Sequence, residues 1–209
     1  MTTPILKHIN SFFNFILVLS KKYNIDESHG IRHSMDVLHY ANNIYESEKN
    51  INPILINHQN IIYTSALLHD MCDKKYVEES EGIKEIELFL KDKLTIKEIE
   101  IVNQIITRMS YSTVKKIGYP NLGEYQLAYH IVREADLLAA YDFDRSIIYK
   151  INCLHENFES AYLDSIKLFE NRVFKHLDDN LFVTEYSKNL AYQLQLNSIS
   201  RINSWKNLI

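Results

Sequence analysis

The chain has 209 residues, of which 46% are apolar, and this size and composition suit one domain with a complete hydrophobic core. A net charge of −4 with 24% charged residues argues against a polybasic surface, so no nucleic-acid polymer is expected as a partner. The two cysteines, Cys72 and Cys153, are too few for a disulfide framework and favour a reducing compartment.

The apolar residues near the N-terminus predict a core-facing amphipathic helix over about 4–22 rather than a membrane span. The run FFNFILVL (12–19) is much shorter than the roughly 20 apolar residues that a membrane-spanning helix needs. No small-residue cleavage site follows it. We therefore expect a cytoplasmic protein that does not contact membranes. The apolar positions that recur at helical spacing are Ile5, Ile9, Phe12, Phe13, Ile16 and Leu19.

The rest of the chain also predicts helices. Four glycines and three prolines leave little material for turns, which favours long helices with short connections. Thr95 and Glu98 form a predicted capping box that starts one helix, and IGYPNLGE (117–124) is expected to be a loop. The fold class is therefore all-α, in one domain over 1–209. The other helices are expected over about 30–47, 54–70, 77–92, 124–142, 144–157, 159–177 and 183–207.

The helix over 30–47 should carry one apolar side. The residues expected on this side are Ile31, Met35, Val37, Leu38 and Ala41.

An apolar segment ends in an adjacent histidine and aspartate in SALLHDMCDKKY (65–76). A lone pair of this kind arises by chance in many chains, and its simplest explanation is a capped helix end, with Asp70 or Asp73 serving the following helix. However, Asp70 follows residues that predict a buried helix, and burying an unpaired carboxylate costs several kcal/mol. A divalent cation bound beside Asp70 would offset that cost.

Asp136 presents the same problem, because it lies in the apolar stretch IVREADLLAAYDFDR (131–145). The alanines of this stretch would let another helix approach closely. Upstream, DESHGIRHSMDVLHYA (26–41) offers His29 and His33, and Gly30 indicates that His29 precedes the helix, which makes His33 the better ligand. Imidazole and carboxylate groups together suit Mn, Fe, Co, Ni, Zn or Mg. One ion would satisfy both buried carboxylates.

The order His33 … His69-Asp70 … Asp136 resembles the H…HD…D signature of the HD-domain metal-dependent phosphohydrolases. The resemblance covers about residues 25–145, in the stretches SHGIRHSMDVLHYA, ALLHDMCDKKY and VREADLLAAYD. It implies a multi-helix HD-domain bundle with one His2Asp2 metal centre in its core, and with the C-terminal helices (146–209) packed on it. It also implies hydrolysis of a small-molecule phosphate ester, often a nucleotide.

Two departures from the family pattern bear on the reaction. Residues 71–135 contain only one histidine, His130, and Met109 stands where related sequences often have another. This favours one divalent ion over two, and phosphomonoester hydrolysis over a phosphodiesterase or pyrophosphohydrolase at the same site. A further alternative is a non-catalytic module that binds nucleotides, which the intact set of four ligands disfavours. A homodimer is compatible with each of them.

Four further residues are expected to act on the substrate. A phosphate group requires fixed cations, and the attacking water requires a group that orients it or exchanges a proton with it. Lys75 is the preferred cation, because HDMCDKKY resembles the D-x-K-Y continuation of some HD hydrolases. Asp73 is the expected acid, base or water-orienting group. His29 and Arg32 lie beside the first ligand and are further candidates.

Other residues have simpler explanations. Lys74, Arg133 and Arg145 also lie near the predicted ligands, but Lys74 suits a surface charge and Arg133 a solvated position or a partner for its neighbour Glu134. Cys72 is expected to be a small buried thiol, because no base is placed to activate it. Structural roles are expected for His8, His58, His130, His155 and His176.

Overall fold

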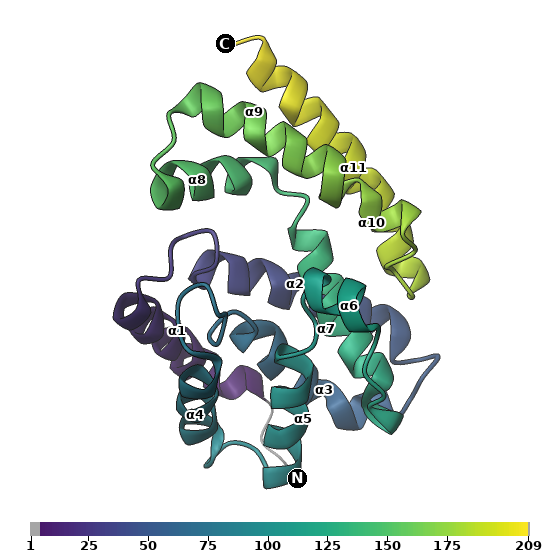
Figure 1. The fold of residues 1–209 in the computed structure, drawn as a ribbon. Coiled ribbons are helices and arrows are strands. Elements are labelled where there is room, and N and C mark those ends of the chain that lie inside the picture. Colours follow the sequence, from purple (N-terminus) through teal and green to yellow (C-terminus); the bar gives the residue numbers. More distant parts are fainter. Residues whose placement is uncertain (1–4, 209) are drawn as a thin grey trace.

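The computed structural model describes residues 5–208, and this part of the chain is helical without a strand, as the all-α prediction requires (Figure 1). The predicted helix start at residue 4 and the side chain of Ile5 lie outside the described part. The elements in chain order are η1 (Ile5–His8), α1 (Ile9–Tyr23), α2 (Ile31–Glu48), α3 (Leu55–Leu68), α4 (Glu79–Leu90), α5 (Ile96–Ile106), α6 (Tyr111–Ile117), η2 (Gly123–Tyr125), α7 (Gln126–Ala139), α8 (Phe143–Leu154), α9 (Phe158–Leu168), η3 (Phe169–Val173), α10 (Lys175–Asp178) and α11 (Glu185–Lys206).

Local sequence explains several helix ends. The predicted capping box of α5 is confirmed: the Thr95 hydroxyl accepts a hydrogen bond from the Glu98 N–H, and the Glu98 carboxylate accepts one from the Thr95 N–H. Asn24 and His155 adopt left-handed backbone conformations and end α1 and α8.

Two expectations about helices were wrong. The short helix α6 was not predicted, because its seven residues are too few to show a clear apolar period. The single helix expected over 159–177 is divided into α9, the π-helical segment η3 and α10. A π-helical turn keeps the helical direction while changing the register, so the sequence pattern does not reveal it.

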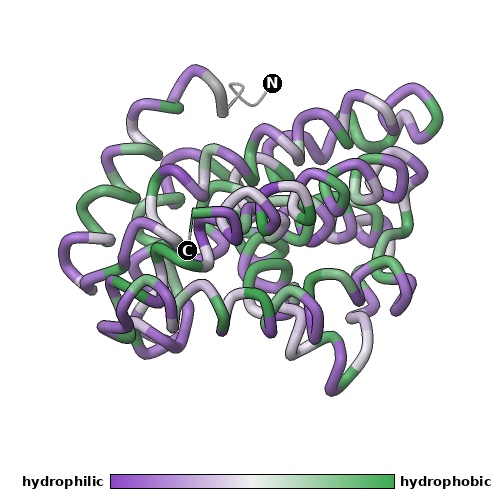
Figure 2. The backbone as a smooth tube through the Cα atoms, turned by 90° about the horizontal axis from the view of Figure 1, so that it is seen from above, coloured by the Kyte–Doolittle hydropathy of each residue, from purple (hydrophilic) through white to green (hydrophobic). Residues whose placement is uncertain are grey.

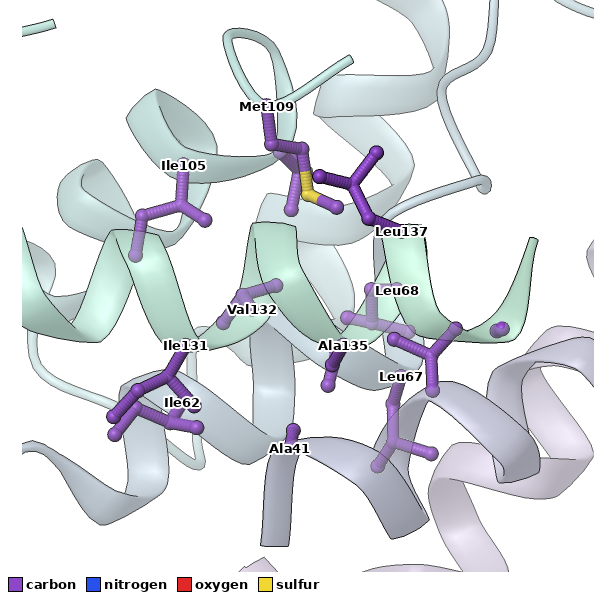
Figure 3. Packing of buried hydrophobic residues seen from close by; sticks show 14 of the residues in the cluster. Ala41, Ile62, Leu67, Leu68, Ile105, Met109, Ile131, Val132, Ala135 and Leu137 are labelled. Atoms are coloured by element: carbon purple, nitrogen blue, oxygen red, sulfur yellow. The ribbon is translucent and has the colours of Figure 1, made fainter. Parts of the chain in front are cut away.

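The centre of the fold is formed by α2, α3 and α7, which pack on one another more extensively than the other described elements do. From His58 onward α3 is buried except at Gln59, which explains its continuous apolar sequence. Small residues let α2 approach α7 closely, which was expected from the alanines near Asp136. Figure 3 shows this core, with side chains from α7 (Ile131, Val132, Ala135), α3 (Ile62, Leu67, Leu68) and α2 (Ala41).

The apolar side expected for α2 needs one correction. Val37 and Ala41 are buried, but Met35 is 46% exposed. Met35 lies two residues after the buried His33, and two residues rotate a helix by about 200°, so its side chain faces away from the core.

The C-terminal helices lie together beside the bundle of α1–α7, and α11 packs on α7 and α2 (Figure 1). A buried polar contact holds the start of α11 to α7. The Glu134 carboxylate accepts hydrogen bonds from the Val183 N–H (2.5 Å) and the Thr184 hydroxyl (2.6 Å). Arg133 donates to the Leu181 carbonyl. The hydropathy along the backbone alternates around most helices, as amphipathic helices require (Figure 2).

Within residues 5–208, no helix combines the length and the apolar character that crossing a bilayer would demand.

Candidate metal centre

Three helices bring His33, His69 and Asp136 to one place. His33 lies in the first turn of α2, His69 directly follows α3, and Asp136 lies in the last turn of α7. One ligand atom from each lies within 4.8 Å of the other two. His33 Nε2 is 3.1 Å from His69 Nε2 and 3.3 Å from Asp136 Oδ1, and His69 Nε2 is 3.7 Å from that oxygen. Both imidazoles are buried, whereas 28% of the Asp136 side chain is exposed.

Asp70 approaches the same point. Its Oδ2 lies 3.4 Å from His33 Nε2 and 3.3 Å from His69 Nε2. This oxygen is buried and accepts no hydrogen bond from any of the residues that the structure describes. On the other side of the ring, His69 Nδ1 donates to the Ala66 carbonyl at 3.0 Å, which leaves Nε2 without a proton in the neutral ring and free to bind an ion. The donor set of two imidazole nitrogens and carboxylate oxygens therefore fits a divalent metal ion.

The four groups change one another's pKa values. Burial by itself lowers the pKa of His69, but the Asp70 carboxylate, with help from Asp136, overcomes this effect and raises that pKa to about 9. For His33, burial and then the nearby Arg145 charge lower the pKa to about 4. Burial would raise the pKa values of Asp70 and Asp136, but the two histidines hold them below the usual range. One proton on His69 thus partly balances two carboxylates, and a divalent cation would balance both.

Arg145 contacts the outer edge of His33. Its Nη1 donates to the Ser28 carbonyl at 3.1 Å and also contacts His33 Nδ1. A guanidinium only donates, so this contact requires an unprotonated Nδ1. An ion on His33 Nε2 would place the ring proton on Nδ1. Arg145 would then need another acceptor, and a phosphate oxygen is a suitable one.

The ligand cluster lies in the wall of a cavity of about 590 Å³. This volume is within the range that small-molecule sites occupy, about 300–1,000 Å³. Hydroxyl groups from α6, α8 and the loop before α2 also line it. Its cationic side chains are Lys74, Lys75, Arg145, Lys150 and Arg172.

Three of the four residues expected to act on a substrate line this cavity and contact one another. His29 Nδ1 lies 2.7 Å from the Ser28 hydroxyl and 3.0 Å from the Tyr76 hydroxyl. Lys75 Nζ lies 3.4 Å from His29 Nε2 and 3.7 Å from Asp73 Oδ2. The Lys75 N–H also donates to Asp73 Oδ1 at 2.9 Å, which fixes that carboxylate.

Arg32, the fourth, is not brought to the cavity. Its side chain is 76% exposed and pairs with Asp36 at 3.0 Å. Adjacent helical residues point about 100° apart, so a buried His33 directs Arg32 toward solvent. Arg133 is not in the cavity wall either, because it is fully buried against the Leu181 carbonyl and Tyr119.

Cys72 lines the cavity but is poorly suited to act as a nucleophile. The thiol is buried, and burial followed by the negative charge of Glu79 raises its pKa to about 12. A thiol with such a pKa carries almost no thiolate near neutral pH. This agrees with the expectation of a small buried thiol.

Sequence reasoning missed the C-terminal part of the wall. Tyr149 and Lys150 of α8 line the cavity, as do Arg172 of η3 and His176 of α10. No motif marks these residues. The four-residue spacing of Arg172 and His176 would suggest one face of a regular helix, but the π-helical segment η3 lies between them and changes the register.

Comparisons with known proteins give the fold. No family model and no curated protein matches the chain by sequence. A crystal structure of a protein from Lactobacillus plantarum, solved as a structural-genomics target, is similar with a TM-score of 0.71. The similarity covers 99% of this chain and 98% of that chain at 18% sequence identity. At this identity, the likeness establishes a shared all-α fold and nothing further.

Proposed function

We propose that this protein is a metal-dependent phosphohydrolase that cleaves a phosphomonoester of a small molecule, as the resemblance of its motifs to HD-domain hydrolases implies. The observation that carries the proposal is the convergence of His33, His69 and Asp136 beside a cavity with fixed cations. A cluster of histidine and aspartate alone is compatible with many metal-dependent reactions. The lysines and arginines of the same cavity favour an anionic substrate.

The ligand set would be His33, His69, Asp136 and Asp70. The fourth ligand is supported by Asp70 Oδ2, because this buried oxygen accepts no hydrogen bond from the described residues and lies 3.3 Å from His69 Nε2, the nitrogen that the same ion would bind. When bound, a divalent ion lowers the pKa of a coordinated water and polarises the phosphoryl oxygens. The segment 71–135 contains only one histidine, His130, which does not line the cavity, and Met109 stands in one of the positions in question, which favours a single ion.

The other residues would bind phosphate and handle protons. Arg145 and Lys75 present cations to the phosphate group, and His29 lies beside Lys75 in the wall. Asp73, held by the Lys75 N–H, would accept a proton from the attacking water or donate one to the leaving oxygen. These groups line the same cavity as the candidate metal ligands, which supports the proposal.

The proposal is tested with purified protein loaded with Mn²⁺, Co²⁺ or Ni²⁺. We expect phosphate release from at least one member of a panel of nucleotides and sugar phosphates, and loss of activity with a chelator. His69→Ala should lose both the bound ion and the activity. His39→Ala is the matched control. It removes another imidazole, but His39 lies on α2, pairs with Asn43 and is outside the cavity.

A protein that holds one ion per chain and releases no phosphate from any compound would refute the proposal. Two ions per chain, or cleavage of a diester, would instead identify the phosphodiesterase alternative. Calorimetric binding of nucleotides without turnover would identify a non-catalytic binding module.

A further inference from the structure

A histidine outside the metal centre lies in the cavity wall without a hydrogen-bond partner. His176 of α10 is 1% exposed, and the ring lines the cavity that contains the metal ligands. Both of its ring nitrogens are buried, and neither has a partner among the described residues. Buried polar groups are nearly always paired, so an unpaired imidazole in a cavity wall is a candidate to hydrogen-bond a molecule bound in that cavity.

The neighbours of His176 are rings that cannot replace such a ligand. Its ring centroid lies 5.5 Å from that of Tyr111, 5.9 Å from that of Tyr141 and 6.4 Å from that of Phe182. The Tyr141 hydroxyl is itself buried and has no hydrogen-bond partner within residues 5–208. The imidazole is therefore held in place by packing, while its polar edge stays unused.

Arg172, one turn earlier in the chain, completes this part of the wall. Its guanidinium lies 4.6 Å from the centroid of the Tyr111 ring, and both residues line the cavity. Arg172 belongs to the π-helical segment η3, and such segments occur frequently at functional sites. Met109 and Phe169 add apolar surface. This part of the cavity wall thus offers aromatic rings, a guanidinium plane and one unpaired imidazole.

We propose that His176 is a specificity-determining residue that hydrogen-bonds the leaving group of the phosphate ester, and that this group carries a planar heterocycle. Tyr111 and Arg172 would provide the flat surface beside it. The inference rests on the proposed function, because the phosphate must lie at the metal centre for the leaving group to reach this wall.

The chemistry of the ring agrees with this assignment. Burial and the Arg172 charge lower the pKa of His176 to about 4, so the ring is neutral near pH 7 and offers one donor and one acceptor. The edge of a heterocycle can pair with both the donor and the acceptor nitrogen of His176, whereas a phosphate group can pair only with the donor. The χ2 angle of histidine is broad and two-fold, so turning the ring exchanges the edge that faces the cavity.

The test compares His176→Phe with the wild-type protein. This change keeps an aromatic ring and removes both nitrogens. We expect kcat/KM for nucleoside 5′-monophosphates to fall by roughly 10- to 100-fold more than kcat/KM for p-nitrophenyl phosphate, the range for one lost buried hydrogen bond. Calorimetry should show weaker binding of the same nucleotides. His58→Phe is the matched control, because His58 is also buried with an unpaired Nδ1 but lies outside the cavity.

If His176→Phe lowers kcat/KM by the same factor for nucleotides and for p-nitrophenyl phosphate, or changes neither, the inference is overturned. A wild-type protein that cleaves p-nitrophenyl phosphate but neither cleaves nor binds any nucleotide would overturn it as well. If the wild-type protein hydrolyses nothing, the proposed function fails by itself, and calorimetry then decides. Weaker nucleotide binding by His176→Phe than by the wild-type protein supports the role of His176 in binding the heterocycle. Equal binding, or no binding by either protein, rejects that role.

Discussion

Lowering the pH should weaken metal binding by close to tenfold per pH unit, because a proton on His69 competes with the ion. The pKa of His69 is raised to about 9 in the metal-free protein, whereas that of His33 is lowered to about 4. Only the His69 proton therefore has to leave when an ion binds above pH 6. Between pH 8 and pH 6 the affinity should fall by about 100-fold, or about 3 kcal/mol, since one pKa unit corresponds to about 1.4 kcal/mol.

Isothermal titration of Mn²⁺ at pH 6, 7 and 8, in buffers of different ionisation enthalpy, measures both the affinity and the number of protons released. We expect nearly one proton per ion. His69→Asn should bind the ion more weakly and lose most of the pH dependence. A flat affinity between pH 6 and 8, or the release of two protons, would refute this account of the four coupled groups.

The same shift in pKa affects the stability of the metal-free protein. Because the pKa of His69 is raised above its ordinary value of 6.5, the stabilisation is fully present below pH 6.5 and is lost as the pH rises through about 9. The increase in Tm on adding Mn²⁺ should therefore grow with pH. An increase that stays constant with pH would contradict this role of the His69 proton. Gly82→Ala should lower the free energy of unfolding in urea by about 1–3 kcal/mol, because the added Cβ would lie 2.7 Å from Cys72 Cα. As a control, Ser80→Ala on the exposed side of α4 should have little effect. Thr184→Ala should lower the free energy of unfolding by about 1–3 kcal/mol in the same assay, because it removes both the N-cap of α11 and a buried hydrogen bond to Glu134. A loss below about 0.5 kcal/mol would show that the contact contributes little. Iodoacetamide at pH 8 should leave Cys72 unmodified in the folded protein, which mass spectrometry can check, because the thiol is buried and its pKa is raised to about 12.

The two candidate carboxylate ligands could be predicted because each carries a local contradiction, and the histidines were assigned with the help of the motif resemblance. A carboxylate within an apolar helical sequence has to be compensated, and this holds for Asp70 and Asp136 whatever the fold. The helices themselves follow from the scarcity of glycine and proline and from apolar periodicity, and the capping box at Thr95 is readable from four residues. These signals depend on short stretches of chain, so a single sequence contains them.

The wall of the cavity depends on how helices distant in the sequence pack together. The sequence around His176 does not distinguish it from a structural histidine, and only the placement of α10 beside α6 and Tyr141 brings it to the cavity. Arg32 shows the converse, because its position beside His33 in the sequence predicted a shared site, and helical rotation separates them.

The sequence by itself determined the all-α class and pointed to the carboxylates of the candidate metal centre, because amphipathic period and buried charge are local properties. Only the tertiary structure decided which cations and rings face the ligands, since the register of α8, η3 and α10 against the bundle is set by packing. That packing is the sum of many weak apolar contacts, and no single residue encodes it.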